Sequence, residues 1–185
     1  MASMMSLPRT GHIKLIFQMF AFLKNKHNDV MVFDPTEPDI DNSQFKNEVC
    51  SVSAYGEFKE EITPNSPRSR GIGFTMRAFF DSDHAGNTTT RRSRTGFLIF
   101  LNCVPIYWFS KNQTSIETSS FGSEFVAIKR CCEYFYGLRY KLRMMVIPVE
   151  MPTFVFGDNQ SVLANMLMPH STLKKKSSSI SFHFV

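Results

Sequence analysis

The stretch TGFLIFLNCVPIYWF, residues 95–109, consists of two apolar runs separated by two residues. Residues 95–101 and 104–109 are rich in aromatic and branched side chains, which favour β-strands. Only Asn102 and Cys103 lie between the runs, and so short a connection is typical of a β-hairpin. The stretch therefore predicts two neighbouring antiparallel strands.

The flanking sequence extends this hairpin into an α/β pattern. Residues 74–81 form a candidate strand, which a polar turn at 83–94 separates from the hairpin. Residues 119–144 predict a long helix, residues 153–157 a fourth strand and residues 159–167 a second helix. The apolar residues of the long helix fall on one stripe: Phe121, Phe125, Ile128, Cys132, Phe135, Leu138 and Leu142. This order predicts a mixed sheet covered by helices, with the last strand parallel to the first.

The first part of the chain has a different pattern. Residues 12–25 predict a short helix, and residues 30–33 and 49–55 predict strands. Residues 57–70 are charged, contain two prolines and are interpreted as a linker. We therefore expect two parts, residues 1–72 and residues 73–185.

The charge and cysteine content of the chain indicate which binding partners and which cellular compartment to expect. The whole chain has a net charge of +5, and residues 71–185 carry 13 lysines and arginines against 7 aspartates and glutamates. A basic face suits nucleic acid, although a solvated surface explains the same charge. The four cysteines lack metal-ligand spacing and are expected to be buried free thiols. With no apolar run long enough to span a membrane and no signal peptide, the expected location is intracellular, cytoplasmic or nuclear.

Three carboxylates occupy positions where elements of the predicted fold begin or end. Asp81 ends the first strand and Asp158 the fourth, and ligands of α/β sheets bind at such strand ends. Glu124 lies early in the long helix, on or beside its apolar stripe. Converging carboxylates repel one another unless a divalent cation such as Mg²⁺ or Mn²⁺ lies between them. Structural roles remain open: Asp158 and Asn159 as a helix cap, Asp81 and Asp83 as turn formers, and Glu124 as a partner of the helix dipole.

The sequence motifs around these three carboxylates resemble those of a known protein family. Residues 80–86 (FDSDHAG), 91–96 (RRSRTG), 108–113 (WFSKNQ), 119–125 (SSFGSEF) and 155–161 (VFGDNQS) follow one another in order. Together they resemble the ribonuclease H region of Copia-type retrotransposon polyproteins, over about residues 73–185. Residues 8–12, 22–24 and 33–35 resemble the stretch that joins the reverse transcriptase to its ribonuclease H in such polyproteins.

The resemblance implies a ribonuclease H-like fold that cleaves the RNA strand of RNA–DNA hybrids by two-metal catalysis. Asp81, Glu124 and Asp158 match the family's metal-binding and catalytic carboxylates. Four basic side chains are expected either to contact phosphates of the nucleic acid or to lie in solvated loops. They are Arg91, Arg92, Arg94 and Lys111. Trp108 is assigned to the core rather than to base stacking.

The chain also departs from the family pattern at its C-terminal end. The family continues with a further strand and a helix that supplies a fourth aspartate, whereas this chain stops at Val185. We therefore expect a C-terminally truncated domain with weak or lost activity. The alternatives are a non-catalytic nucleic-acid-binding remnant and a pseudogene product that does not fold stably.

Overall fold

The computed structural model of the chain describes residues 9–30, 32–41, 43, 62, 64–149 and 151–166. The chain divides into two compact units, Met1–Val32 and Phe33–Val185. The expected strand at 49–55, residues 57–61 and 63 of the expected linker at 57–70, and the tail after residue 166 lie outside the described residues. None of the helices in the described part of the chain is both long and apolar enough to cross a membrane.

The first unit contains helix α1 (Thr10–Asn25), which confirms the helix expected at 12–25. The helix has no buried residue, and its large apolar side chains are exposed. The strand expected at 30–33 is wrong for residues 30, 32 and 33, which belong to no helix or strand. Four residues offer too few backbone hydrogen bonds to form a strand unless a neighbouring strand pairs with them.

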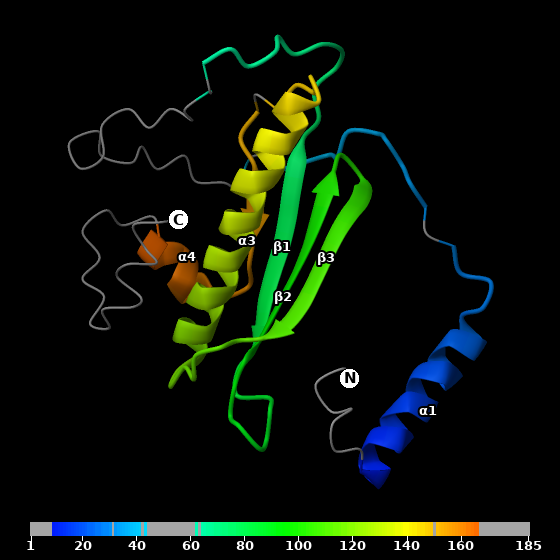
Figure 1. Ribbon diagram of the computed structural model, residues 1–185. Coiled ribbons are helices and arrows are strands. Elements are labelled where there is room, and N and C mark those ends of the chain that lie inside the picture. Colours follow the sequence, from blue (N-terminus) through cyan, green and yellow to red (C-terminus); the bar gives the residue numbers. More distant parts are fainter. Residues whose placement is uncertain are drawn as a thin grey trace. The chain divides into compact units, whose positions relative to one another are not determined.

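The second unit is a mixed α/β fold, which confirms the predicted fold class. Its elements are β1 (Met76–Asp83), β2 (Arg94–Leu101), β3 (Val104–Asn112), α3 (Ser120–Met144), β4 (Phe154–Phe156) and α4 (Gln160–Met166). The sheet order is β3-β2-β1-β4, with β1 antiparallel to β2 and parallel to β4 (Figure 1). Strand β1 begins and ends two residues later than predicted, because Ser82 and Asp83 still pair with β2.

The connection between β2 and β3 is the predicted two-residue hairpin turn. Asn102 has a positive φ of 53°, a conformation that asparagine tolerates better than most residues. Its side chain accepts a hydrogen bond from the Thr75 amide (2.9 Å) and donates one to the Pro35 carbonyl (2.9 Å). The turn therefore anchors the segment around Pro35, which lies upstream of the expected boundary at residue 72.

Helix α3 covers one face of the sheet and forms the core with it (Figure 1). Phe125, Ile128 and Phe135 are buried as the stripe predicts, and the Ser119 side chain caps the helix by accepting from the Gly122 amide (3.2 Å). Buried partners come from the inner sides of the strands: Met76, Ala78, Phe80, Phe97 and Ile99. Cys103, Cys131 and Cys132 are free thiols, but only Cys131 is fully buried, and Cys50 lies outside the described residues.

Trp108 is not in the core, so that prediction is wrong: its exposed fraction is 61%. Its neighbours Tyr107 and Phe109 pack against the core. Because side chains alternate between the two faces of a strand, the residue between them points away from α3.

Candidate metal centre

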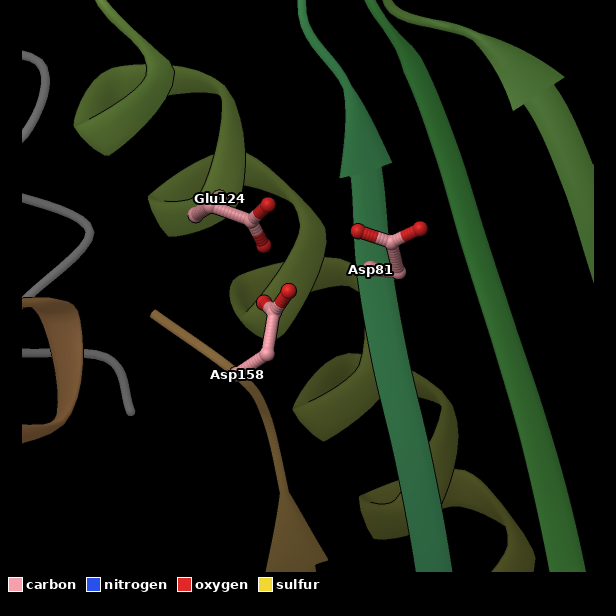
Figure 2. Close-up of side chains that lie close together, drawn as sticks. All are labelled: Asp81, Glu124 and Asp158. Carbon is pink, nitrogen blue, oxygen red and sulfur yellow. The ribbon is translucent and has the colours of Figure 1, made fainter. Parts of the chain in front are cut away.

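Asp81, Glu124 and Asp158 come together from three different elements. Asp81 belongs to β1, Glu124 to α3, and Asp158 follows β4 (Figure 2). Each offers one carboxylate oxygen, and these three oxygens lie within 4.8 Å of one another. Within the described ranges, this is the one group of three acidic, histidine or cysteine side chains so arranged. The structure thus brings together the three residues singled out in the sequence.

Parallel pairing of β1 and β4 places the two aspartates side by side. Phe79 on β1 pairs with Phe156 on β4. Asp81 follows Phe79 by two residues and Asp158 follows Phe156 by two residues, so the two aspartates lie at equivalent positions along the two segments. Strand β4 ends at Phe156 while β1 continues to Asp83, so Asp81 has no β4 residue paired with it. The missing pair leaves an opening beside β1 that Glu124 can reach from α3.

Glu124 is held in this opening by the strand itself. The Ser82 amide donates to Glu124 Oε1 (3.2 Å), and the Ser82 hydroxyl donates to Ser123 Oγ (2.9 Å). Sequence reasoning missed both serines. Strand alternation could have found Ser82, because it predicts that the residue after Asp81 faces α3.

Glu124 is a buried acid with one unsatisfied oxygen. Its exposed fraction is 5%, and its buried Oε2 has no hydrogen-bond partner among the described residues. Burial raises the pKa of the Glu124 carboxyl, the Ser82 hydrogen bonds oppose that rise, and the negative charges of Asp81 and Asp158 add to it. Glu124 Oε2 is therefore a buried acceptor beside two other carboxylates, with no positive group from the described ranges to compensate the three. Carboxylate oxygens arranged in this way are suitable ligands for Mg²⁺ or Mn²⁺.

The structure also separates Asp158 from a capping role. Asn159 Oδ1 accepts a hydrogen bond from the Val162 amide (3.2 Å) at the start of α4. Asn159 therefore satisfies the helix end, and no hydrogen bond or ion pair from the described part of the chain reaches the Asp158 carboxylate. Of the pair Asp158 and Asn159, which the sequence offered as a cap, Asn159 therefore caps α4.

The position of Asp158 depends on close packing at Gly157. A Cβ atom at Gly157 would collide with the ring of Phe80, which is itself buried in the core. Only glycine lets the chain leave β4 this close to β1. This contact, which no motif spacing reveals, sets where the third carboxylate emerges.

Asp83 belongs to the turn rather than to the carboxylate group. Its carboxylate fills the space in which a Cβ atom of Gly86 would lie. The turn-forming alternative therefore describes Asp83, whereas Asp81 points to the other two acids (Figure 2).

The four basic candidates lie at the same end of the sheet as Asp81. Arg91 and Arg92 are exposed in the loop that follows β1. Arg94 begins β2 opposite Asp83, and Lys111 pairs with Thr95 on β3. No salt bridge within the described ranges uses any of the four.

The comparisons with known proteins identify retroelement relatives. The chain is 49% identical over 53 residues to the uncharacterized mitochondrial protein AtMg00810 of Arabidopsis thaliana, covering 29% of this chain and 22% of that protein. It is 24% identical over 116 residues to the retrovirus-related Pol polyproteins from transposons RE2 and RE1 of Arabidopsis thaliana. Those matches cover 63% of this chain but only 8% of each polyprotein. No family model and no solved structure matches the chain. The relatives support a retrotransposon polyprotein origin for this chain, which contains a retroelement-derived α/β domain.

Proposed function

We propose that this chain is a Copia-type ribonuclease H-like domain that cleaves the RNA strand of RNA–DNA hybrids. The observation that carries the proposal is the buried, unpartnered Glu124 Oε2 beside the carboxylates of Asp81 and Asp158. A buried acceptor left without a donor costs free energy, which a bound cation would offset. The related Pol polyproteins support a nucleic-acid substrate.

The donor set fits magnesium or manganese. Asp81, Glu124 and Asp158 would hold the ions through carboxylate oxygens, the ligands that these hard cations prefer. Bound ions would polarise the scissile phosphate, lower the pKa of an attacking water and stabilise the leaving oxygen. The chain itself keeps Glu124 in place through the Ser82 amide and places Asp158 through the contact between Gly157 and Phe80.

The basic residues near this end of the sheet suit the phosphate backbone. We assign Arg91, Arg92, Arg94 and Lys111 to phosphate contacts that hold the hybrid without reading its sequence. Binding should then weaken steeply as the salt concentration rises, because each neutralised phosphate releases counterions.

The decisive experiment follows cleavage of an end-labelled RNA–DNA hybrid by the purified full chain. We expect cleavage of the RNA strand in Mg²⁺ or Mn²⁺ and none in EDTA. Asp158→Asn should abolish cleavage, because it removes a charged ligand without changing the side-chain shape. Asp83→Asn is the matched control and should keep the parent rate, because Asp83 lies against Gly86 outside the carboxylate group.

Two results would contradict the assignment. One is a full cleavage rate in Asp158→Asn, which would place the chemistry elsewhere. The other is hybrid binding without cleavage in both metals, which would identify a non-catalytic nucleic-acid-binding remnant instead. A thermal-shift titration with Mg²⁺ alone gives a separate measure of the metal site, because a ligand that binds only the folded state raises the melting temperature.

A further inference from the structure

Gln113, the last residue of the motif at 108–113, follows β3 directly, and its side chain is buried. The side-chain Nε2 donates to Thr95 Oγ1 on β2 (3.1 Å) and to the Ser123 carbonyl on α3 (2.8 Å). The backbone amide of Gln113 donates to the Ser93 carbonyl, just before β2 (2.8 Å). One residue therefore joins the sheet to the first turn of α3.

Two serine hydroxyls continue this connection to β1. Ser82 Oγ donates to Ser123 Oγ (2.9 Å), which donates in turn to the Ser120 carbonyl (2.8 Å). Ser82 is also the β1 residue that pairs with Thr95. We call four side chains the polar network: Ser82, Thr95, Gln113 and Ser123. The polar network adjoins Glu124, because the Ser82 amide donates to Glu124 Oε1 and Ser123 is the preceding residue of α3.

The polar network is a costly way to fill the space between the sheet and α3. Gln113, Thr95 and Ser123 have exposed fractions of 5%, 2% and 0%. Gln113 Oε1 is buried without a hydrogen-bond partner among the described residues, a cost that an apolar side chain would not incur. Hydrogen bonds, however, fix the separation and orientation of the groups that they join more narrowly than apolar contacts do. The network therefore suits a place where α3 must keep one position relative to the sheet.

Glu124 occupies such a place. It comes from α3, whereas Asp81 belongs to β1 and Asp158 follows β4, and their three oxygens lie within 4.8 Å of one another (Figure 2). A small slide or rotation of the first turn of α3 would move Glu124 away from both aspartates. Hydrogen bonds that support metal ligands matter for this reason, and losing one typically lowers metal affinity by about 10–100-fold.

We propose that Gln113 is a positioning residue of the carboxylate group. It fixes the first turn of α3 to β2 through Ser123 and Thr95, so that Glu124 stays beside Asp81 and Asp158. Gln113 acts through Ser123 and Ser82 and is itself no ligand of the metal. The inference rests on the proposed function, because the role that it gives to Gln113 belongs to the metal site proposed there.

The Mg²⁺ dissociation constant of the folded full chain, measured by isothermal titration calorimetry, tests this role. Gln113→Met keeps a side chain of similar length that donates no hydrogen bond, and it should raise the dissociation constant by about tenfold or more. A double variant, Thr95→Val with Gln113→Met, replaces both members of a buried hydrogen bond by apolar groups. It should regain part of the stability that Gln113→Met loses, while the Mg²⁺ affinity stays low. A parental dissociation constant in both variants overturns the proposal.

Asn102→Gly is the matched control for a general loss of stability. Asn102 is equally buried, with an exposed fraction of 5%, and its side chain also makes two hydrogen bonds, but it lies beyond the opposite end of β2. This variant should unfold more readily than the parent chain and bind Mg²⁺ with the parental dissociation constant. Equal weakening of Mg²⁺ binding by Asn102→Gly and Gln113→Met also overturns the proposal, because any loss of stability would then have the same effect.

Hydrogen exchange of the Ser82 amide in EDTA tests the positioning apart from the metal. This amide donates to Glu124 Oε1, so its protection reports whether Glu124 stays against β1. Gln113→Met should lower the protection of the Ser82 amide relative to the β2 amides by about tenfold, whereas Asn102→Gly should lower all of them alike. An unchanged relative protection in Gln113→Met contradicts the role of Gln113. A parent chain that binds no Mg²⁺ contradicts the proposed function instead, and the Ser82 amide still decides whether Gln113 positions Glu124.

Discussion

Glu124 shows how one buried side chain links pH, stability and metal binding. Its pKa is raised above the ordinary value of 4.5, chiefly by burial, so in the metal-free chain the folded state favours the protonated form. The stability contributed by that protonated form is present below pH 4.5 and is lost as the pH rises through the raised pKa. Above the raised pKa, loss of that protonated form therefore leaves the metal-free fold less stable than it is below pH 4.5.

Glu124→Gln should separate these effects. The amide keeps the oxygen that accepts from the Ser82 amide but removes the charge. In EDTA we expect the variant to melt above the parent chain at neutral pH, with the difference vanishing below pH 4.5. Addition of Mg²⁺ should raise the melting temperature of the parent and not of the variant. Identical pH profiles for the two proteins would contradict this account.

Gly157→Ala should disturb the site without touching a carboxylate. The added Cβ meets the Phe80 ring, so Phe80 or the chain that carries Asp158 must move. Overpacking of this kind costs about 1–3 kcal/mol, measured by urea denaturation. The Mg²⁺-induced thermal shift should also fall.

Gly137→Ala is the control for glycine replacement. Gly137 lies within α3, and a Cβ atom there has no neighbour within 4 Å. Because alanine is the better helix former, this variant should gain about 0.5–1 kcal/mol and leave the Mg²⁺ response unchanged. Equal losses in the two variants would disprove the role given to the contact between Gly157 and Phe80.

At the scale of elements, the C-terminal end of α3 has the hydrogen bonds of a Schellman C-cap, but the position where glycine is usual is occupied by valine. The Ile147 amide donates to the Leu142 carbonyl (3.0 Å) and the Val146 amide to the Arg143 carbonyl (2.8 Å). These bonds place Val146 at φ 67°, where helices usually have glycine. A β-branched residue in this conformation is strained.

Val146→Gly should therefore stabilise the chain. Relief of the left-handed conformation contributes about 1–2 kcal/mol, partly offset by the flexibility of glycine in the unfolded state. Met145→Gly is the control, because Met145, one residue earlier, has an unstrained φ of −85°. This variant should lower the stability of the fold. Chemical denaturation of both variants measures the difference, and a loss of stability in Val146→Gly would contradict the strain.

At the scale of the whole molecule, the Asn102 turn connects parts that are distant in sequence. Its side chain bonds the Thr75 amide and the Pro35 carbonyl, and it is nearly buried. Asn102→Gly keeps a residue that tolerates positive φ but removes both hydrogen bonds. We expect a loss of about 2 kcal/mol in cooperative unfolding of the full chain. An unchanged urea midpoint would show that the Pro35 segment does not contribute to the fold.

Much of the fold was predictable because local patterns repeat over long elements. The apolar stripe of α3, the hairpin at Asn102 and the α/β order are all properties of neighbouring residues. The prediction for Trp108 failed because an aromatic side chain favours burial by its type, whereas strand alternation turns Trp108 away from the core that Tyr107 and Phe109 contact. The boundaries of β1 were two residues off, since the end of a strand depends on what its neighbour pairs with.

The sequence by itself determined which carboxylates to consider, because Asp81, Glu124 and Asp158 stand at recognisable places in ordered motifs. Only the tertiary structure decided that they meet within 4.8 Å, that Glu124 Oε2 has no partner there, and that Asn159 rather than Asp158 caps α4. The reason is physical: burial and convergence depend on the parallel pairing of β1 with β4 and on the packing of Phe80 against Gly157. Both are contacts between residues more than seventy positions apart, and no local pattern encodes such contacts.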